Sequence, residues 1–199
     1  MLPSFRVAWL LLSIDAVQTA FFLFIFTVSP AVLSGGFRFQ EGISEFAVYV
    51  SCDDPQSWEQ LYGLTTRVAS SVASRLGRQP KLVEFWRQKP DPEDTPFKRH
   101  GLYKIAAHFR MALQRAFSER GNSHVILVEE DLVLAPDFLE FFSAGARVME
   151  ADTTVWCVSA WNDNGLDNLV RDERRLFRTD YFPGLGWMLK KEVGRDRLI

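Results

Sequence analysis

The sequence of 199 residues is poor in cysteine and carries no excess of charge of either sign. Its two cysteines are too few for the disulfide framework of a small secreted domain, and both lie in strand-like runs. We therefore expect Cys52 and Cys157 to be free, buried thiols, although a single bridge between them stays open. Lysine and arginine number 23 against 25 acidic residues, so the chain has no basic surface for nucleic acid. A phosphate-binding loop of the GxxxxGKS or GxxxxGKT type is also absent, which argues against an ordinary NTPase.

The composition that is present is typical of a globular protein. Apolar residues make up 47% and charged residues 24%, which excludes a disordered or collagen-like chain. At about 150 residues per domain, the length predicts one domain, or one domain with an appendage. Aromatic residues are abundant at 14%, with 17 phenylalanines and 6 tryptophans, so we expect large rings in a core or in a sugar-binding site.

The amino-terminal part of the chain is strongly apolar. Between residues 7 and 33 only Asp15 is charged, and such a run is long enough for a helix that crosses a bilayer. We expect residues 1–36 to form an uncleaved membrane anchor and residues 37–199 to form the lumenal domain. A cleaved signal peptide fits less well, because its apolar region normally has only about 7 to 15 residues. The alternative is a pair of buried elements, with residues 7–14 as an inner strand.

After residue 36, short β-rich runs alternate with amphipathic stretches. This alternation predicts an α/β fold, with an open, mostly parallel sheet and helices on both faces. The expected strands are residues 46–50, 81–86, 124–128 and 155–160, and the expected helices are residues 56–76, 101–117 and 135–149.

Two acidic clusters follow predicted strands, where open α/β sheets bind their ligands. Asp53 and Asp54 follow the first of these strands, and Glu129, Glu130 and Asp131 follow the third. Adjacent carboxylates repel one another, and a hard divalent cation with oxygen ligands relieves that repulsion. The triplet therefore indicates Mg²⁺ or Mn²⁺ holding a diphosphate. The alternative is that these carboxylates only cap the helices that follow.

Four longer segments resemble a known family. They are GLYKIAAHFRMAL (101–113), VILVEEDLVLAPDFLEFF (125–142), WCVSAWNDNG (156–165) and FRTDYFPGLGW (177–187). In order and spacing they resemble the alpha-1,3-mannosyl-glycoprotein 2-beta-N-acetylglucosaminyltransferases (N-acetylglucosaminyltransferase I) and their O-mannose-linked relatives. The resemblance implies a GT-A fold in a single-pass type II Golgi membrane protein whose catalytic part is lumenal. It also implies Mn²⁺-dependent, inverting transfer of GlcNAc from UDP-GlcNAc to the 2-hydroxyl of a mannose on a glycoprotein glycan.

The resemblance assigns roles to individual residues around the donor. Asp131 would bind Mn²⁺, Glu130 would face the ribose or sugar, and Glu129 would face the GlcNAc. Asp53 would hydrogen-bond the uracil, and His108 would lie beside the nucleotide. The alternative for His108 is a core histidine on a helix face, and the residue pattern alone favours that alternative.

A second group of residues would support the sugar site. Trp161, Asp163, Gly186 and Trp187 lie in motifs whose glycines permit tight turns and whose tryptophans can stack on a sugar. The alternative for both motifs is a structural turn with a core aromatic residue. His100 and His124 match no functional position, and we expect them at the surface or at a strand edge.

The sequence departs from the family pattern at both ends. The family's first strand, with its Cys-Asp-Arg-like motif, is not recognisable, and residues 7–33 stand in its place. The family's catalytic base, in a Trp-Asp-Asp-Trp-like motif, is expected beyond Ile199, so we assign no catalytic base here. We therefore expect a partial GT-A domain that is catalytically crippled as written. One alternative is a membrane-anchored module that binds a nucleotide sugar without transferring it, and a weaker one is a soluble Mg²⁺-dependent nucleotidyl transferase.

Overall fold

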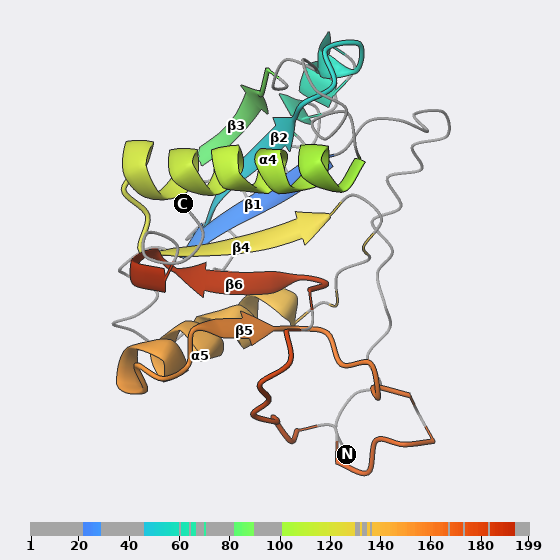
Figure 1. The fold of residues 1–199 in the computed structure, drawn as a ribbon, viewed down its shortest axis with the longest axis vertical. Coiled ribbons are helices and arrows are strands. Elements are labelled where there is room, and N and C mark those ends of the chain that lie inside the picture. The colour runs from blue at the N-terminus through green and yellow to red at the C-terminus, as the bar shows by residue number, and fades with distance from the viewer. Residues whose placement is uncertain are drawn as a thin grey trace.

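The structure is a computed structural model. It describes residues 22–28, 46–89 except 60, 64, 67–69 and 71–81, and 101–193 except 130, 131, 133, 134, 136, 167, 173 and 183. Within these residues, one sheet contains the strands β1 (Phe22–Val28), β2 (Phe46–Cys52), β3 (Leu82–Arg87), β4 (His124–Glu129), β5 (Cys157–Ser159) and β6 (Trp187–Lys190). The longer helices are α4 (Gly101–Gln114), which continues into the π-helical turn η2 (Arg115–Glu119), and α5 (Phe138–Ala151) (Figure 1). Residues 58, 59, 61–63, 65, 66 and 70, within the helix expected at 56–76, are helical too, as are residues 191–193.

The sheet has the strand order β3-β2-β1-β4-β6-β5. Only β2 and β3 pair in parallel, because β1 and β6 run antiparallel to the strands on either side of them. The combination of helices and strands is consistent with the predicted α/β class, but the sheet is mixed rather than mostly parallel. The strands β2, β3, β4 and β5 nevertheless share one direction, so their carboxyl ends meet at one edge (Figure 1).

Strand β1 corrects the prediction of an amino-terminal apolar helix. Phe22–Val28 lies inside the run expected to be helical, and it forms a strand that hydrogen-bonds to β2 on one side and to β4 on the other. A central strand satisfies its backbone groups on both sides and tolerates the same continuous apolar sequence as a buried helix. Among the described residues, no helix has both the length and the hydropathy to cross a bilayer.

The rest of the amino-terminal run lies outside the described residues, including the alternative strand at residues 7–14. The domain boundary after residue 36 stays a prediction.

Helices cover both faces of the sheet, as expected, and the alternation of side chains along each strand divides the core into two layers. Val125 and Leu127 of β4 belong to the layer under α4 and η2, which also contains the fully buried Phe117. Ile126 and Val128 point the other way and pack against α5. The face of α4 that meets the sheet is mostly apolar, but it carries His108.

The state of both cysteines and the burial of His124 also test predictions made from the sequence. Cys52 and Cys157 are both thiols outside any disulfide, as predicted; Cys52 is buried and Cys157 is partly buried. His124 was expected at the surface or at a strand edge, and that expectation is wrong, because its side chain is fully buried at the start of β4. The reason is that Glu150 at the end of α5 and Lys190 at the end of β6 close over this corner of the sheet.

Candidate functional site

The candidate site lies at the edge where the strands of shared direction end. Cys52 at the end of β2 is paired with Phe22, and Glu129 at the end of β4 is paired with the next residue, Leu23. Only β1 therefore separates the two predicted acidic clusters. Loops that follow such strand ends are the usual place for ligands in α/β folds.

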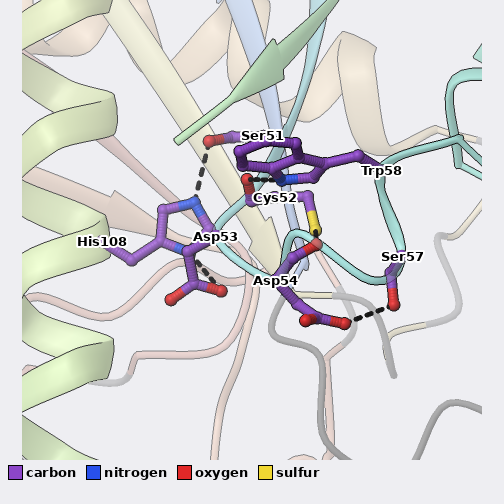
Figure 2. Close-up of polar contacts among 7 residues, drawn as sticks. All are labelled: Ser51, Cys52, Asp53, Asp54, Ser57, Trp58 and His108. Carbon is purple, nitrogen blue, oxygen red and sulfur yellow. Dashed lines mark hydrogen bonds and ion pairs between the residues drawn. The ribbon is translucent and has the colours of Figure 1, made fainter. Parts of the chain in front are cut away.

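Helix α4 brings His108 to the end of β2, where it faces Asp53. The Nδ1 atom of His108 lies 3.7 Å from Oδ1 of Asp53, and its Nε2 atom lies 2.8 Å from Oγ of Ser51. Figure 2 shows the imidazole between these two side chains. Ser51 and His108 are both fully buried, whereas Asp53 is partly exposed. The structure thus brings together the residue that was predicted to hydrogen-bond the uracil and the one that was predicted to lie beside the nucleotide.

Burial shifts the pKa values of both the His108 ring and the Asp53 carboxyl group. It lowers the pKa of His108 to about 4, so the imidazole is neutral at neutral pH. Burial also raises the pKa of Asp53, with a further rise from the neighbouring Asp54; a backbone hydrogen bond and the charge of Lys104 act in the opposite direction. The contact between Asp53 and His108 is therefore one between a carboxyl group and a neutral ring, not an ion pair.

The neighbouring aspartate has a structural role. Oδ1 of Asp54 accepts a hydrogen bond from the backbone N–H of Gln56, and its Oδ2 accepts one from the hydroxyl of Ser57 at 2.5 Å. The indole N–H of Trp58 donates to the carbonyl oxygen of Cys52 at 3.0 Å, which fixes the same turn (Figure 2). The capping interpretation of the first acidic cluster therefore holds for Asp54, while Asp53 faces the site.

Only the first residue of the acidic triplet is described. Glu129 ends β4 and is partly buried, whereas Glu130 and Asp131 lie outside the described residues. In the part of the chain that the structure describes, no three histidine, cysteine, aspartate or glutamate side chains lie close enough to hold a metal ion. Glu129, the first residue of the triplet, lies at the same edge of the sheet as Asp53, and the metal-binding role of the triplet stays a prediction.

The residues predicted to support a sugar lie around the ends of β5 and β6. Trp161 is half exposed, and its indole N–H donates to Oδ1 of Asp163 at 2.9 Å. The backbone N–H of Ala160 donates to the carbonyl oxygen of Gly186, which joins the two motifs. Gly186 has a φ of +64°, where a glycine is favoured.

Trp187 is a core residue. Its ring is buried and packs on Phe109 of α4 and on Phe182, with centroid distances of 5.9 Å and 4.9 Å. This packing agrees with the alternative of a core aromatic residue. Its role toward a sugar stays a prediction, as does that of Asp163.

Two buried polar residues at this edge were missed. Ser51 alternates with Ala47 and Tyr49 on the face of β2 that meets α4, so the period of two could have identified it as an inward polar residue. Gln88 directly follows β3 and donates its backbone N–H to the carbonyl of Cys52 at 2.8 Å. Its buried side-chain amide nitrogen has no hydrogen-bond partner among the described residues. A polar residue directly after an apolar strand was the only available signal for Gln88.

Comparison with known families matches residues 78–196 to the GNT-I family. The chain belongs to the GNT-I family. An alpha-1,3-mannosyl-glycoprotein 2-beta-N-acetylglucosaminyltransferase from Arabidopsis thaliana is 44% identical over 105 residues, which are 53% of this chain and 24% of that protein. The chain thus spans about a quarter of the length of this GNT-I relative. The resemblance seen in the sequence motifs is confirmed.

The GNT-I match divides the site into two parts. His108, the acidic triplet and the motifs around Trp161 and Trp187 lie within residues 78–196, whereas Ser51 and Asp53 precede them. The contact between Asp53 and His108 therefore joins a residue outside the matched region to one inside it.

Proposed function

We propose that the chain forms the donor-binding part of an N-acetylglucosaminyltransferase that uses UDP-GlcNAc. Membership of the GNT-I family and the name of the Arabidopsis relative support GlcNAc transfer as the activity. The observation that carries the proposal for this chain is the contact of Asp53 with His108 beside the end of β2. The contact places a carboxyl group at the edge where ligands of α/β sheets bind.

The chemistry of this pair suits a uracil base. An ionised carboxylate only accepts hydrogen bonds, and uracil offers a single N–H donor between two carbonyl groups. Asp53 is partly exposed and accepts that N–H, while the buried imidazole of His108 supports it from behind. Cytosine lacks this N–H, so the same carboxylate discriminates against it.

The acidic triplet suits the diphosphate and the sugar. Asp131 would hold Mn²⁺, with Glu130 toward the ribose or sugar and Glu129 toward the GlcNAc. Mn²⁺ bound there would neutralise the charge of the diphosphate leaving group. Trp161, Asp163, Gly186 and Trp187 would shape the side of the site that receives the sugar.

The remaining details rest on the family resemblance. The reaction would be an inverting transfer of GlcNAc to the 2-hydroxyl of a mannose on a glycoprotein glycan. A carboxylate beyond Ile199 in the family pattern would accept the proton of that hydroxyl, which is worth about 10²–10⁴-fold in rate. The proposed location is the Golgi membrane, with the catalytic part lumenal.

Calorimetric titration of the full chain with UDP-GlcNAc, with MnCl₂ present, tests donor binding. We expect Asp53→Asn to weaken binding by about tenfold or more, because a hydrogen bond to a charged group is lost. Glu119→Gln is the matched control, since it removes an exposed carboxylate near the opposite end of the sheet. CDP should compete poorly and UDP well.

Absence of any UDP-GlcNAc binding, or equal binding by the Asp53→Asn variant, would contradict the proposal. A transfer assay with a mannose-terminated glycan, run beside the titration, separates an enzyme from a module that only binds the donor.

A further inference from the structure

Ser51 contacts the His108 ring beside Asp53, and its buried hydroxyl has so far been given no role. Its Oγ lies 2.8 Å from Nε2 of His108, on the side of the ring opposite Asp53 (Figure 2). We propose that Ser51 is a positioning residue that donates its hydroxyl proton to Nε2 of His108 and thereby keeps the imidazole in the tautomer that carries its proton on Nδ1, facing Asp53.

The argument starts from the hydrogen-bonding capacity of the three groups. A neutral imidazole has one N–H and one lone pair, and a serine hydroxyl can donate or accept. An ionised carboxylate can only accept. With Oδ1 of Asp53 at 3.7 Å from Nδ1, a proton on Nδ1 is attracted to the carboxylate, whereas a lone pair there is repelled.

The lone pair therefore belongs to Nε2, and the partner of Nε2 must donate. Ser51 is that partner, and it sits on a strand with its side chain fully buried, so water cannot replace it. The opposite tautomer would set a nitrogen lone pair against a carboxylate in a poorly solvated place. Low local polarity strengthens that repulsion.

The proton on Nδ1 also orients the carboxyl group of Asp53. Its Oδ1 is the oxygen that faces the ring, which leaves Oδ2 for a ligand. Asp54 repels the carboxylate and Lys104 attracts it, so the imidazole N–H is one of several groups that settle its direction. This step rests on the proposed function, because the ligand it prepares for is the N–H of a uracil base.

Nitrogen NMR of the histidine ring tests the tautomer without any ligand. The full chain is labelled with ¹⁵N-histidine, and the signals of His108 are assigned by their loss in a His108→Gln variant. At pH 7.5 we expect the wild-type chain to show a protonated Nδ1 and an unprotonated Nε2. A protonated Nε2, or an even mixture of tautomers, overturns the proposal.

Two variants of Ser51 then separate positioning from packing. Ser51→Ala removes the hydroxyl and should give a mixture of tautomers, while Ser51→Thr keeps the hydroxyl and should retain the wild-type signals. For UDP-GlcNAc with MnCl₂, the Kd should rise about three- to tenfold in Ser51→Ala and recover in Ser51→Thr. If Ser51→Ala keeps the wild-type tautomer, Ser51 does not fix the tautomer and the proposal is wrong.

The two readouts fail independently. The tautomer can depend on Ser51 while neither the wild-type chain nor any variant binds UDP-GlcNAc. In that case the proposed function is wrong, but the orientation of the ring by Ser51 is retained. If UDP-GlcNAc binds equally well with either tautomer, the positioning role fails and the proposed function stands.

Discussion

Oδ1 of Asp53 lies 3.7 Å from Nδ1 of His108, and this contact links the end of β2 to the middle of α4. Burial lowers the pKa of His108 to about 4, so the ring that faces Asp53 is neutral at neutral pH. Protonation of His108 would place a charge in the buried layer between β2 and α4.

Folding stability should therefore fall in mild acid. The pKa of His108 is lowered from 6.5 to about 4 by burial, so the unfolded chain binds a proton at higher pH than the folded chain does. The contribution of His108 is fully present above pH 6.5 and is lost as the pH falls toward 4. At about 1.4 kcal/mol per pH unit, the loss from this residue amounts to about 3 kcal/mol.

Urea denaturation between pH 7.5 and pH 4.5 measures this loss. Burial also lowers the pKa of His124, which adds to the slope in the same direction, so the comparison must be with a His108→Gln variant. That variant should show a shallower dependence on pH. Equal slopes in the two proteins would mean that His108 does not couple folding to protonation.

Metal dependence should reside in Asp131. With Asp131→Asn, the binding of UDP-GlcNAc should no longer respond to MnCl₂ or to EDTA, because the proposed metal ligand is gone. Asp137→Asn is a matched control, since Asp137 is exposed before α5 and makes no capping hydrogen bond through its side chain. Retained Mn²⁺ dependence in the Asp131→Asn variant would move the metal site elsewhere.

Gly186→Ala should destabilise the fold by about 1–2 kcal/mol, as measured by thermal or urea unfolding. Its φ of +64° strains any residue with a Cβ, and that Cβ would lie 3.4 Å from the ring of Phe138. Gly121→Ala shares the strain, with a φ of +69°, but meets nothing within 4 Å. Gly184→Ala lacks this strain, and its Cβ would make an ordinary contact with the ring of Phe182 at 3.5 Å, so it should be neutral. A Gly186→Ala variant as stable as Gly184→Ala would refute this account of the turn.

Phe142→Ala should cost about 3–5 kcal/mol of unfolding free energy. The ring is fully buried between α5 and the sheet and packs edge-on against Phe138 at 4.8 Å. Val148→Ala, on the exposed side of the same helix, should change stability by less than about 0.5 kcal/mol. Similar losses for the two variants would indicate that α5 does not pack as described.

Cys157 should be unreactive in the native protein. Burial raises the pKa of its thiol to about 12, so almost no thiolate exists at pH 8, and the thiolate is the reactive form. Alkylation by iodoacetamide, followed by mass spectrometry, should modify Cys157 quickly only after denaturation. Rapid modification of the folded chain would show that β5 opens readily.

The sequence predicted the elements whose pattern is set locally. The strand expected at 124–128 is β4 (His124–Glu129), and the helix expected at 101–117 is α4 followed by η2. In both elements, the spacing of the hydrophobic residues along the sequence matches the face that packs into the core. The family resemblance assigned both Asp53 and His108 to the donor site, but their contact with each other was not predicted, because no local pattern reports on a contact between distant segments.

The features that the sequence did not predict depend on which segments of the chain pair or pack with each other. Phe22–Val28 suits a central strand and a membrane helix equally well, and only its hydrogen bonds to β2 and β4 decide between them. The short strand β6 was not predicted, although its insertion between β4 and β5 makes the sheet mixed. Ser51 was missed because its importance comes from a helix that packs over it.

The position of β1 also bears on how the chain can be handled and made. In the described sheet, β2 and β3 on one side and β4, β6 and β5 on the other meet only through Phe22–Val28. Cutting the chain after Val28 would leave two edges with unpaired backbone groups, a known cause of aggregation. In chain order β1 precedes both of its neighbours, so during synthesis one of its edges stays unpaired until β4 has been made.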